Sequence, residues 1–216
     1  MEPFTTLTGV AAPMLVDDLN TDQITPVHRE ATLDPDYARM LFSRLRFNDD
    51  GSENPDFFLN QEPFRETRIL VSGNNFGCGS SREGAVWALA AYGIRCVVAR
   101  SFADIFRENC LKNGVLPVTL APEDARRFEA LVVEADGAAA FTADLVSQRI
   151  ACPDGTGFAF DIAPGERTAL LEGLDDIGLT LKHADDIGAW ETRMRGAMPW
   201  LQTLADRRAR GTCGAG

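Results

Sequence analysis

Short apolar runs alternate with helical stretches in the centre of the chain. Three runs have the length and continuous apolar character of strands that are buried on both faces: residues 68–72, 94–99 and 115–120. Between them, residues 83–92 and 102–113 repeat apolar side chains at helical spacing, and a glycine follows each stretch and ends it. Ser101 is the expected N-cap of the second helix. This alternation predicts parallel strands joined by right-handed crossovers.

The flanking regions follow other patterns. Residues 1–26 predict a strand and then a polar loop, and residues 35–47 predict a helix with Asp34 as its N-cap. Residues 48–63 are rich in Asn, Asp, Gly and Pro, and predict a loop long enough to be a candidate for function. Further elements are expected toward the C-terminus: a helix at 123–133, strands at 143–152 and 158–162, and two short helical pieces within 170–190.

These elements together predict an α/β fold with a mainly parallel central sheet, flanking helices and an additional β-rich layer. The chain has 216 residues, of which 45% are hydrophobic, so it is long enough to bury a core without disulfides or metals. We expect a single domain over residues 1–205 and a flexible tail over residues 206–216, where arginine and glycine are frequent.

The charge of the chain narrows the classes of partner. The chain carries 21 basic and 32 acidic side chains, a formal net charge of -11, which disfavours binding to nucleic acid or to an anionic membrane. No apolar run approaches the ~20 residues that a transmembrane helix requires. The N-terminal residues MEPFTTLTGV lack the cationic and apolar regions of a secretory signal. We therefore expect a cytoplasmic protein.

The cysteines and histidines do not form a recognisable metal motif. The five cysteines are odd in number and widely spaced, so we expect reduced thiols in place of a disulfide framework. The two histidines, His28 and His183, lie far from any cysteine along the chain. The sequence therefore predicts no metal site built by this chain alone.

The most distinctive segment is the loop between the first central strand and the helix after it, Gly73-Asn74-Asn75-Phe76-Gly77-Cys78-Gly79-Ser80-Ser81-Arg82-Glu83. Its glycines permit a backbone in which the N–H groups of Gly77, Cys78 and Gly79 turn toward an anion. Ser80 and Ser81 are expected N-caps, and Arg82, in the first helical turn, offers a fork suited to a carboxylate. The alternative is a turn that only caps and redirects the chain.

Other readings of this loop are less favourable. The loop lacks the lysine of a phosphate-binding P-loop and the third glycine of the dinucleotide fingerprint, so nucleotides are disfavoured. A cysteine near a helix N-terminus has a lowered pKa, which would suit Cys78 to a role as a nucleophile. No histidine is nearby in the sequence to serve as its base, so a packed thiol is the preferred reading of Cys78.

The loop also carries a family resemblance. FGCGSSRE, WAL, SFADIF and LPV, in this order, resemble the small subunits of 3-isopropylmalate dehydratases (isopropylmalate isomerases), which are similar to the mobile swivel domain of aconitase. The resemblance covers nearly the whole chain through four further blocks: Asn20–Asp22, Arg46–Asn48, Asn54–Phe57 and Gly173–Leu181.

The resemblance implies a division of labour between two chains. A separate large subunit would hold a [4Fe-4S] cluster, and this chain would cover the cluster and complete the active site for a small dicarboxylate. Ser80 matches the serine that acts as the catalytic base in aconitase-like enzymes, and Ser81 and Arg82 match residues that hold a substrate carboxylate. The implied reaction converts 2-isopropylmalate to 3-isopropylmalate, a step of leucine biosynthesis, in a heterodimeric hydro-lyase.

Three positions depart from the familiar pattern of this family. Gly84 stands where histidine is usual, Val86 where proline is usual, and Val27 where a basic residue is usual, with Arg29 as a candidate to supply the missing charge. These departures leave open a related 2-alkylmalate or citraconate hydratase. A subunit that assists assembly without donating a catalytic group is the other alternative.

Overall fold

The computed structural model describes residues 1–26, 35–80, 82–198 and 200. The chain divides into two compact units, Met1–Asp175 and Asp176–Gly216, which are treated separately below. The expected tail at residues 206–216 lies outside the described residues, and the domain boundary expected from the sequence stays a prediction.

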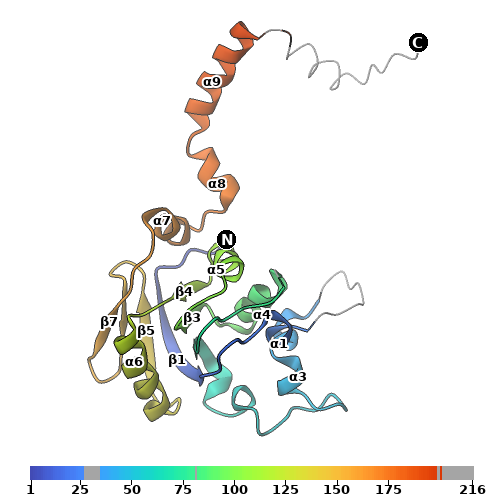
Figure 1. The fold of residues 1–216 in the computed structure, drawn as a ribbon, viewed down its shortest axis with the longest axis vertical. Coiled ribbons are helices and arrows are strands. Elements are labelled where there is room, and N and C mark those ends of the chain that lie inside the picture. The colour runs from blue at the N-terminus through green and yellow to red at the C-terminus, as the bar shows by residue number, and fades with distance from the viewer. Residues whose placement is uncertain (27–34, 81, 199, 201–216) are drawn as a thin grey trace, which may run out of the picture. The chain divides into compact units, whose positions relative to one another are not determined.

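A mixed sheet organises the first unit. Its seven strands follow the order β4-β3-β2-β1-β5-β6-β7 (Figure 1). β1 to β4 pair in parallel, and β5 to β7 continue the sheet beyond β1 as antiparallel neighbours. The strands are β1 (Thr6–Met14), β2 (Thr67–Ser72), β3 (Cys96–Ala99), β4 (Leu116–Val118), β5 (Ala140–Asp144), β6 (Arg149–Ala151) and β7 (Gly157–Ala159).

Helices connect and cover the strands of this unit. The α-helices are α1 (Thr21–Ile24), α2 (Tyr37–Met40), α3 (Ser43–Arg46), α4 (Gly84–Tyr92), α5 (Asp104–Lys112), α6 (Pro122–Ala135) and α7 (Pro164–Glu172). Two 3-10 helices, η1 (Phe58–Asn60) and η2 (Phe64–Glu66), interrupt the segment before β2. The second unit contains α8 (Asp176–Leu181) and α9 (Ala184–Ala197).

The central strands are apolar on both sides because each side of the sheet faces its own core. Ile69 and Val71 of β2 belong to one buried cluster, whereas Leu70 between them belongs to the other. β3 alternates in the same way, with Val98 in the first cluster and Val97 in the second. The two-residue period of a strand sends successive side chains to opposite faces, so the continuous apolar runs of the sequence are explained.

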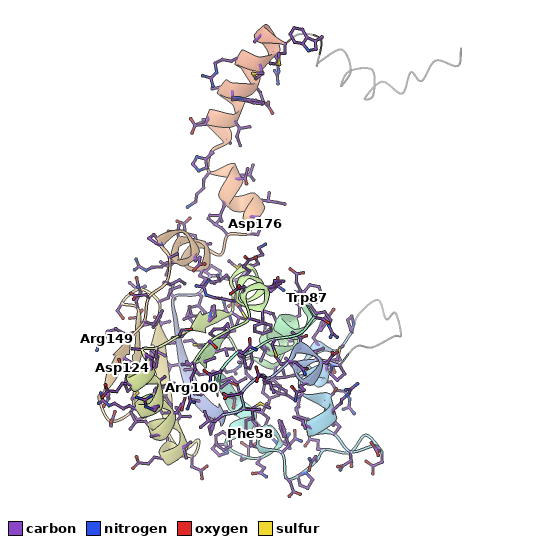
Figure 2. All side chains as sticks on the ribbon, viewed as in Figure 1. Phe58, Trp87, Arg100, Asp124, Arg149 and Asp176 are labelled. Atoms are coloured by element: carbon purple, nitrogen blue, oxygen red, sulfur yellow. The ribbon has the colours of Figure 1, made fainter. Side chains whose placement is uncertain are left out.

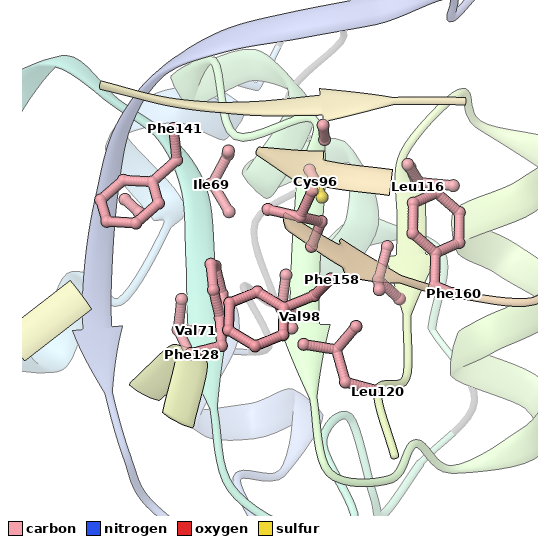
Figure 3. Packing of buried hydrophobic residues seen from close by; sticks show 14 of the residues in the cluster. Ile69, Val71, Cys96, Val98, Leu116, Leu120, Phe128, Phe141, Phe158 and Phe160 are labelled. Carbon is pink, nitrogen blue, oxygen red and sulfur yellow. The ribbon is translucent and has the colours of Figure 1, made fainter. Parts of the chain in front are cut away.

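The antiparallel half of the sheet closes the first of these clusters. Phe141 of β5 and Phe158 of β7 pack edge to face on Phe128 of α6, with ring centroids 5.6 and 5.7 Å away (Figure 3). The same cluster contains residues of β2, β3 and β4. The expected α/β fold is thus confirmed, and its β-rich part is continuous with the parallel sheet.

Two elements differ from the sequence expectation in the antiparallel and C-terminal parts. The strand expected at 143–152 is two strands, because the Asp144 carboxylate accepts hydrogen bonds from the backbone of Val146 and Ser147 and closes a turn before β6. The two short helical pieces expected within 170–190 are parts of three helices: α7 ends at Glu172 before Gly173, whose φ is 68°, and α8 and α9 follow.

The helix expected over residues 35–47 is also broken, into α2 and α3. Phe42 between them adopts a left-handed φ of 48°, is fully buried and donates its N–H to the carbonyl of Ile24 at 2.7 Å. Burial of a large aromatic side chain outweighs a continuous helix here. Asp36 caps α2 by accepting from the N–H of Arg39, and the expected cap Asp34 lies outside the described residues.

Candidate functional site

Three loops meet where the parallel strands end. They follow the carboxyl ends of β1, β2 and β3, which lie at one edge of the sheet because these strands run in parallel. In open α/β sheets, ligands bind outside this edge. The loop after β2 is the glycine-rich segment Gly73 to Arg82, and it lies between the other two.

The loop after β1 is joined to the glycine-rich loop by hydrogen bonds. Asp17 accepts from the backbone N–H of Asn74 at 2.7 Å and from its side-chain amide at 3.1 Å. Asp18 accepts from the side chain of Asn75 at 2.7 Å. The two bonds from Asn74 keep the pKa of the Asp17 carboxyl below its ordinary value. The polar segment after β1, which the sequence predicts as a loop, therefore holds the glycine-rich loop in place. It also contains α1, which Asn20 and Gln23 cap reciprocally.

The loop after β3 is also joined to the glycine-rich loop by hydrogen bonds. Ser101 accepts from the N–H of Asn75 through its hydroxyl at 2.7 Å and from the N–H of Phe76 through its carbonyl at 3.0 Å. The expectation that Ser101 caps the next helix is wrong: α5 begins at Asp104, after Ala103. Beside it, Arg100, labelled in Figure 2, donates two hydrogen bonds of 2.8 and 2.6 Å to Glu129 of α6.

Gly77 and Gly79 both adopt backbone angles that favour glycine, and Gly77 also has no room for a side chain. Gly77 has a φ of 76°, and an added Cβ atom would lie 2.1 Å from the ring of Phe106, so no side chain fits there. Its N–H donates to the carbonyl of Leu19 at 2.8 Å, which removes Gly77 from the expected anion nest. Cys78 forms an isolated parallel bridge with Asn20, and Gly79 has a φ of 90°. The roles of Cys78 and Gly79 toward an anion stay predictions.

The expectation that Ser80 caps α4 is wrong. α4 begins at Gly84, with Glu83 in the N-cap position and no side-chain cap bond. Ser80 lies outside the helix, and its carbonyl accepts a hydrogen bond of 2.9 Å from the hydroxyl of Thr21. Ser80 is exposed, and its hydroxyl has no hydrogen-bond partner among the described residues. The other expected cap, Ser81, and the expected carboxylate ligand Arg29 lie outside the described residues.

Arg82 is only partly satisfied. One terminal nitrogen, Nη2, donates to Oδ1 of Asp22 at 2.5 Å. The other two nitrogens, Nε and Nη1, are shielded from solvent and have no hydrogen-bond partner among the described residues. Buried donors without partners are unfavourable, so this guanidinium is arranged to receive an acceptor. A carboxylate oxygen is a suitable charged acceptor, and because Nε and Nη1 lie on different edges of the guanidinium, each would donate to its own oxygen.

A pocket of about 230 Å³ brings these groups together. Ser80 and Arg82 line it with Thr21, and the start of α5 adds an apolar wall of Ala103, Ile105 and Phe106 beside the acidic Asp104. The lining residues are Thr21, Gly77, Gly79, Ser80, Arg82, Ala103, Asp104, Ile105 and Phe106. An anionic molecule with an apolar substituent matches this combination of an arginine fork, a hydroxyl and an apolar wall.

The cysteines within the described part of the chain are free thiols. Burial raises the pKa of Cys96 and Cys110 far above the ordinary value, and it raises the pKa of Cys152 to about 11, so these thiols are protonated at neutral pH. Cys78 is half-buried, and its sulfur donates to the carbonyl of Asp18 at 3.3 Å. Across residues 1–26, 35–80, 82–198 and 200, no group of three or more Asp, Glu, His and Cys residues could hold a metal ion. None of the helices in these ranges has the length and apolarity to cross a bilayer.

Sequence reasoning missed the partners of the glycine-rich loop. Asp17, Thr21, Asp22 and Ser101 hold the segment or contact Arg82. The signal that could have found two of them is the run Asn20-Thr21-Asp22, one of the blocks of the family resemblance. Of the family departures, neither Gly84 nor Val86 lines the pocket, and Val27 lies outside the described residues.

Two family models match separate parts of the chain. Residues 1–123 match the aconitase C-terminal domain, and residues 176–203 match the C-terminal domain of the 3-isopropylmalate dehydratase small subunit. The 3-isopropylmalate dehydratase small subunit of Rhodospirillum centenum is 53% identical over 203 residues, which cover 93% of this chain and 98% of that protein. The chain belongs to the family of 3-isopropylmalate dehydratase small subunits.

Further comparisons agree with membership of the 3-isopropylmalate dehydratase small-subunit family. The small subunit of Xanthobacter autotrophicus is 51% identical over 204 residues, which cover 93% of this chain and all of that protein. The crystal structure of 3-isopropylmalate dehydratase from Methanocaldococcus jannaschii is similar with a TM-score of 0.59 at 26% identity, and the match covers 86% of this chain and 99% of that one. The resemblance noted from the sequence is confirmed.

Proposed function

We propose that this chain is the small subunit of a two-subunit hydro-lyase that converts 2-isopropylmalate to 3-isopropylmalate in leucine biosynthesis. Its relatives carry the name of this enzyme and match the chain over nearly their whole length. In this proposal the chain is active only together with a large subunit, in the cytoplasm, and acts on a small dicarboxylate.

The observation that carries the assignment of the site is the pocket shared by Ser80 and Arg82. The two unpartnered nitrogens of Arg82 support a role in holding a substrate carboxylate. The exposed hydroxyl of Ser80, in the same pocket, supports a role in proton transfer. The apolar wall supports a substrate with an alkyl group.

The reaction requires a proton to move twice. In the dehydration half, the Ser80 alkoxide takes the proton from the carbon next to the hydroxyl-bearing carbon, and the hydroxyl leaves as hydroxide, which takes a proton from solvent to become water as the alkene forms. In the rehydration half, Ser80 returns its proton to the other carbon, and water adds its hydroxide to the neighbouring one and releases a proton to solvent. A serine is a weak base at its ordinary pKa, so its alkoxide needs the positive charge of Arg82 nearby.

The [4Fe-4S] cluster of this proposal is held by the large subunit. When bound there, it supplies an iron that acts as a Lewis acid on the substrate hydroxyl and a carboxylate. The pocket supports a covering role, because it presents the exposed Ser80 hydroxyl and two Arg82 nitrogens that have no hydrogen-bond partner among the described residues. We also assign Ser81 to substrate carboxylate binding by its place in the family pattern. Arg29 is a further candidate, because it could supply the charge that is missing at Val27.

The substrate is tested by reconstituting the two subunits anaerobically and offering 2-isopropylmalate, citraconate and citrate in parallel. We expect 2-isopropylmalate to give the highest kcat/KM, because neither Gly84 nor Val86 reaches the pocket. A clear preference for citraconate would instead assign the chain to a 2-alkylmalate or citraconate hydratase. The assembly-only alternative is tested by the Ser80 variant described in the Discussion.

A further inference from the structure

The described part of the second unit has no core of its own. Among its described residues, neither α8 nor α9 contains a buried side chain. Several large apolar side chains are exposed instead, with exposed fractions of 69% for Ile177, 63% for Leu181 and 55% for Trp190. In the first unit, by contrast, both faces of the sheet are covered.

The apolar side chains of α9 lie along one line. Ile187, Trp190 and Met194 are spaced by three and four residues, the pattern of one helical face. Asp185 and Thr192 lie on the opposite face at the helical period. We call the three apolar residues the α9 stripe. Such a stripe is the recognition element of an amphipathic helix that lies in a hydrophobic groove.

A helix of this kind needs a surface to cover its stripe. α9 has 14 residues, a length at which an isolated helix is marginal in water. Its charges include Asp185, Asp186, Glu191, Arg193 and Arg195 and so have both signs. A mixed charge distribution of this kind does not favour an anionic lipid surface or nucleic acid.

We infer that the α9 stripe docks into an apolar groove of the large subunit and tethers the two chains. This inference rests on the proposed function, which requires a large subunit. The segment matches a family model that describes the C-terminal domain of 3-isopropylmalate dehydratase small subunits and is separate from the aconitase model over residues 1–123. The stripe thus belongs to a module of subunits that work in a two-chain enzyme.

The size of the stripe favours the large subunit over a second copy of this chain. α9 spans about 21 Å at 1.5 Å per residue, so two stripes packed on each other would bury far less than the roughly 1,200 Å² of a stable specific interface. A large subunit that also covers the pocket of the first unit would bind α9 as a second, linked contact. Linked contacts strengthen each other through their high effective concentration.

The test compares two double variants of the complete small subunit. Ile187→Ala with Trp190→Ala removes two of the three stripe residues, and Asp185→Ala with Thr192→Ala changes the opposite face as a matched control. Binding to the large subunit is measured by biolayer interferometry. We expect the stripe variant to raise the Kd by about 10-fold or more, since aromatic anchors dominate such interfaces, and the control by less than about 3-fold.

Three outcomes would overturn the docking inference. The first is a stripe variant that binds the large subunit as tightly as the wild type. The second is a stripe variant whose small subunit alone melts at a clearly lower temperature, which would mean that the stripe packs on its own chain. The third is a self-associating wild-type small subunit that the stripe variant makes monomeric.

The failure of this inference can be told apart from failure of the proposed function. Binding is measured without substrate, whereas the proposed function is tested by turnover of 2-isopropylmalate. If the wild-type pair binds through the stripe but turns over a different substrate, only the assignment of the substrate is wrong. If turnover is as proposed but binding ignores the stripe, only the docking inference is wrong.

Discussion

Two arginines show how the same side chain serves structure in one region and binding in another. Arg46, the last residue of α3, is buried, and its guanidinium donates to Asn60 at 3.2 Å and to the carbonyl of Ala38 at 2.8 Å. It also lies over the rings of Phe47 and Tyr92, at 5.1 and 4.8 Å from their centroids. Arg82 has one partner, Asp22, and two shielded nitrogens that meet no acceptor among the described residues.

The number of hydrogen-bond partners distinguishes an arginine with a structural role, Arg46, from one with a proposed role in binding, Arg82. Burial lowers the pKa of Arg46, and its hydrogen bonds and ring contacts offset the cost of burying the charge. The long loop that the sequence made a candidate for function is thus held by internal contacts, including Asn60, which donates to the carbonyls of Arg46 and Asn54. Two nitrogens of Arg82 have no partner among the described residues, so a ligand can supply the acceptors that the fold does not.

The largest effect is expected from Ser80→Ala. Loss of the proposed base should lower kcat by roughly 100- to 10,000-fold, while assembly with the large subunit stays unchanged. Steady-state kinetics and sedimentation of the complex measure the two effects. Ser52→Ala is the matched control in the structural loop, since that hydroxyl bonds to its neighbours Asp50 and Asn48 and does not line the pocket. Near-normal turnover of Ser80→Ala in an intact complex would favour the assembly-only alternative.

The next effect is expected from Arg82→Lys. An ammonium keeps the charge but cannot reproduce the planar set of donors with which Arg82 can hold Asp22 and a substrate carboxylate at once, so kcat/KM should fall by about 10- to 100-fold. The thermal stability of the small subunit should change little, because Asp22 is the one hydrogen-bond partner of this side chain among the described residues. An unchanged kcat/KM would remove Arg82 from the substrate site.

For Arg46→Met we expect a loss of stability with little change in catalysis, the reverse of the result expected for Arg82→Lys. Loss of a buried, well-bonded guanidinium leaves Asn60 and backbone carbonyls without a donor, which should lower the free energy of unfolding by about 2 kcal/mol. Urea denaturation measures this loss. Arg39→Met is the control, because Arg39 lies over the same Phe47 ring at 4.2 Å but is less buried and should contribute less. If Arg46→Met lowered kcat/KM in the intact complex without lowering the free energy of unfolding, the contrast between the two arginines would fail.

The smallest effect concerns the pH dependence of the Asp17 contact with the glycine-rich loop. The bonds from Asn74 lower the pKa of Asp17 below 3.8, so their contribution is present above that value and is lost as the pH falls through the lowered pKa. The Asn74 amide resonance should therefore stay constant from pH 7 to about pH 5 and shift only in stronger acid. A midpoint above 3.8 in the NMR titration would contradict the contact.

Much of the central fold could be predicted because its signals are local. The apolar runs at 68–72, 94–99 and 115–120 correspond to β2, β3 and β4, and the helix ending at Gly93 corresponds to α4. Each of these follows from periodicity and from a glycine stop. The break at Phe42 could not be predicted in this way, since it depends on a carbonyl of Ile24 and on a core that distant residues build.

The sequence by itself determined the chemistry of the loop from Gly73 to Arg82, namely glycines that permit unusual backbone angles, a serine hydroxyl and an arginine. Only the tertiary structure decided how these groups are used: the N–H of Gly77 is bonded to Leu19, Ser101 holds the loop instead of capping α5, and Arg82 meets Asp22. Asp22 and Arg82 are 60 residues apart in the chain. Local patterns record which atoms a segment carries, but a buried donor finds its acceptor only when the strands that carry both loops have paired.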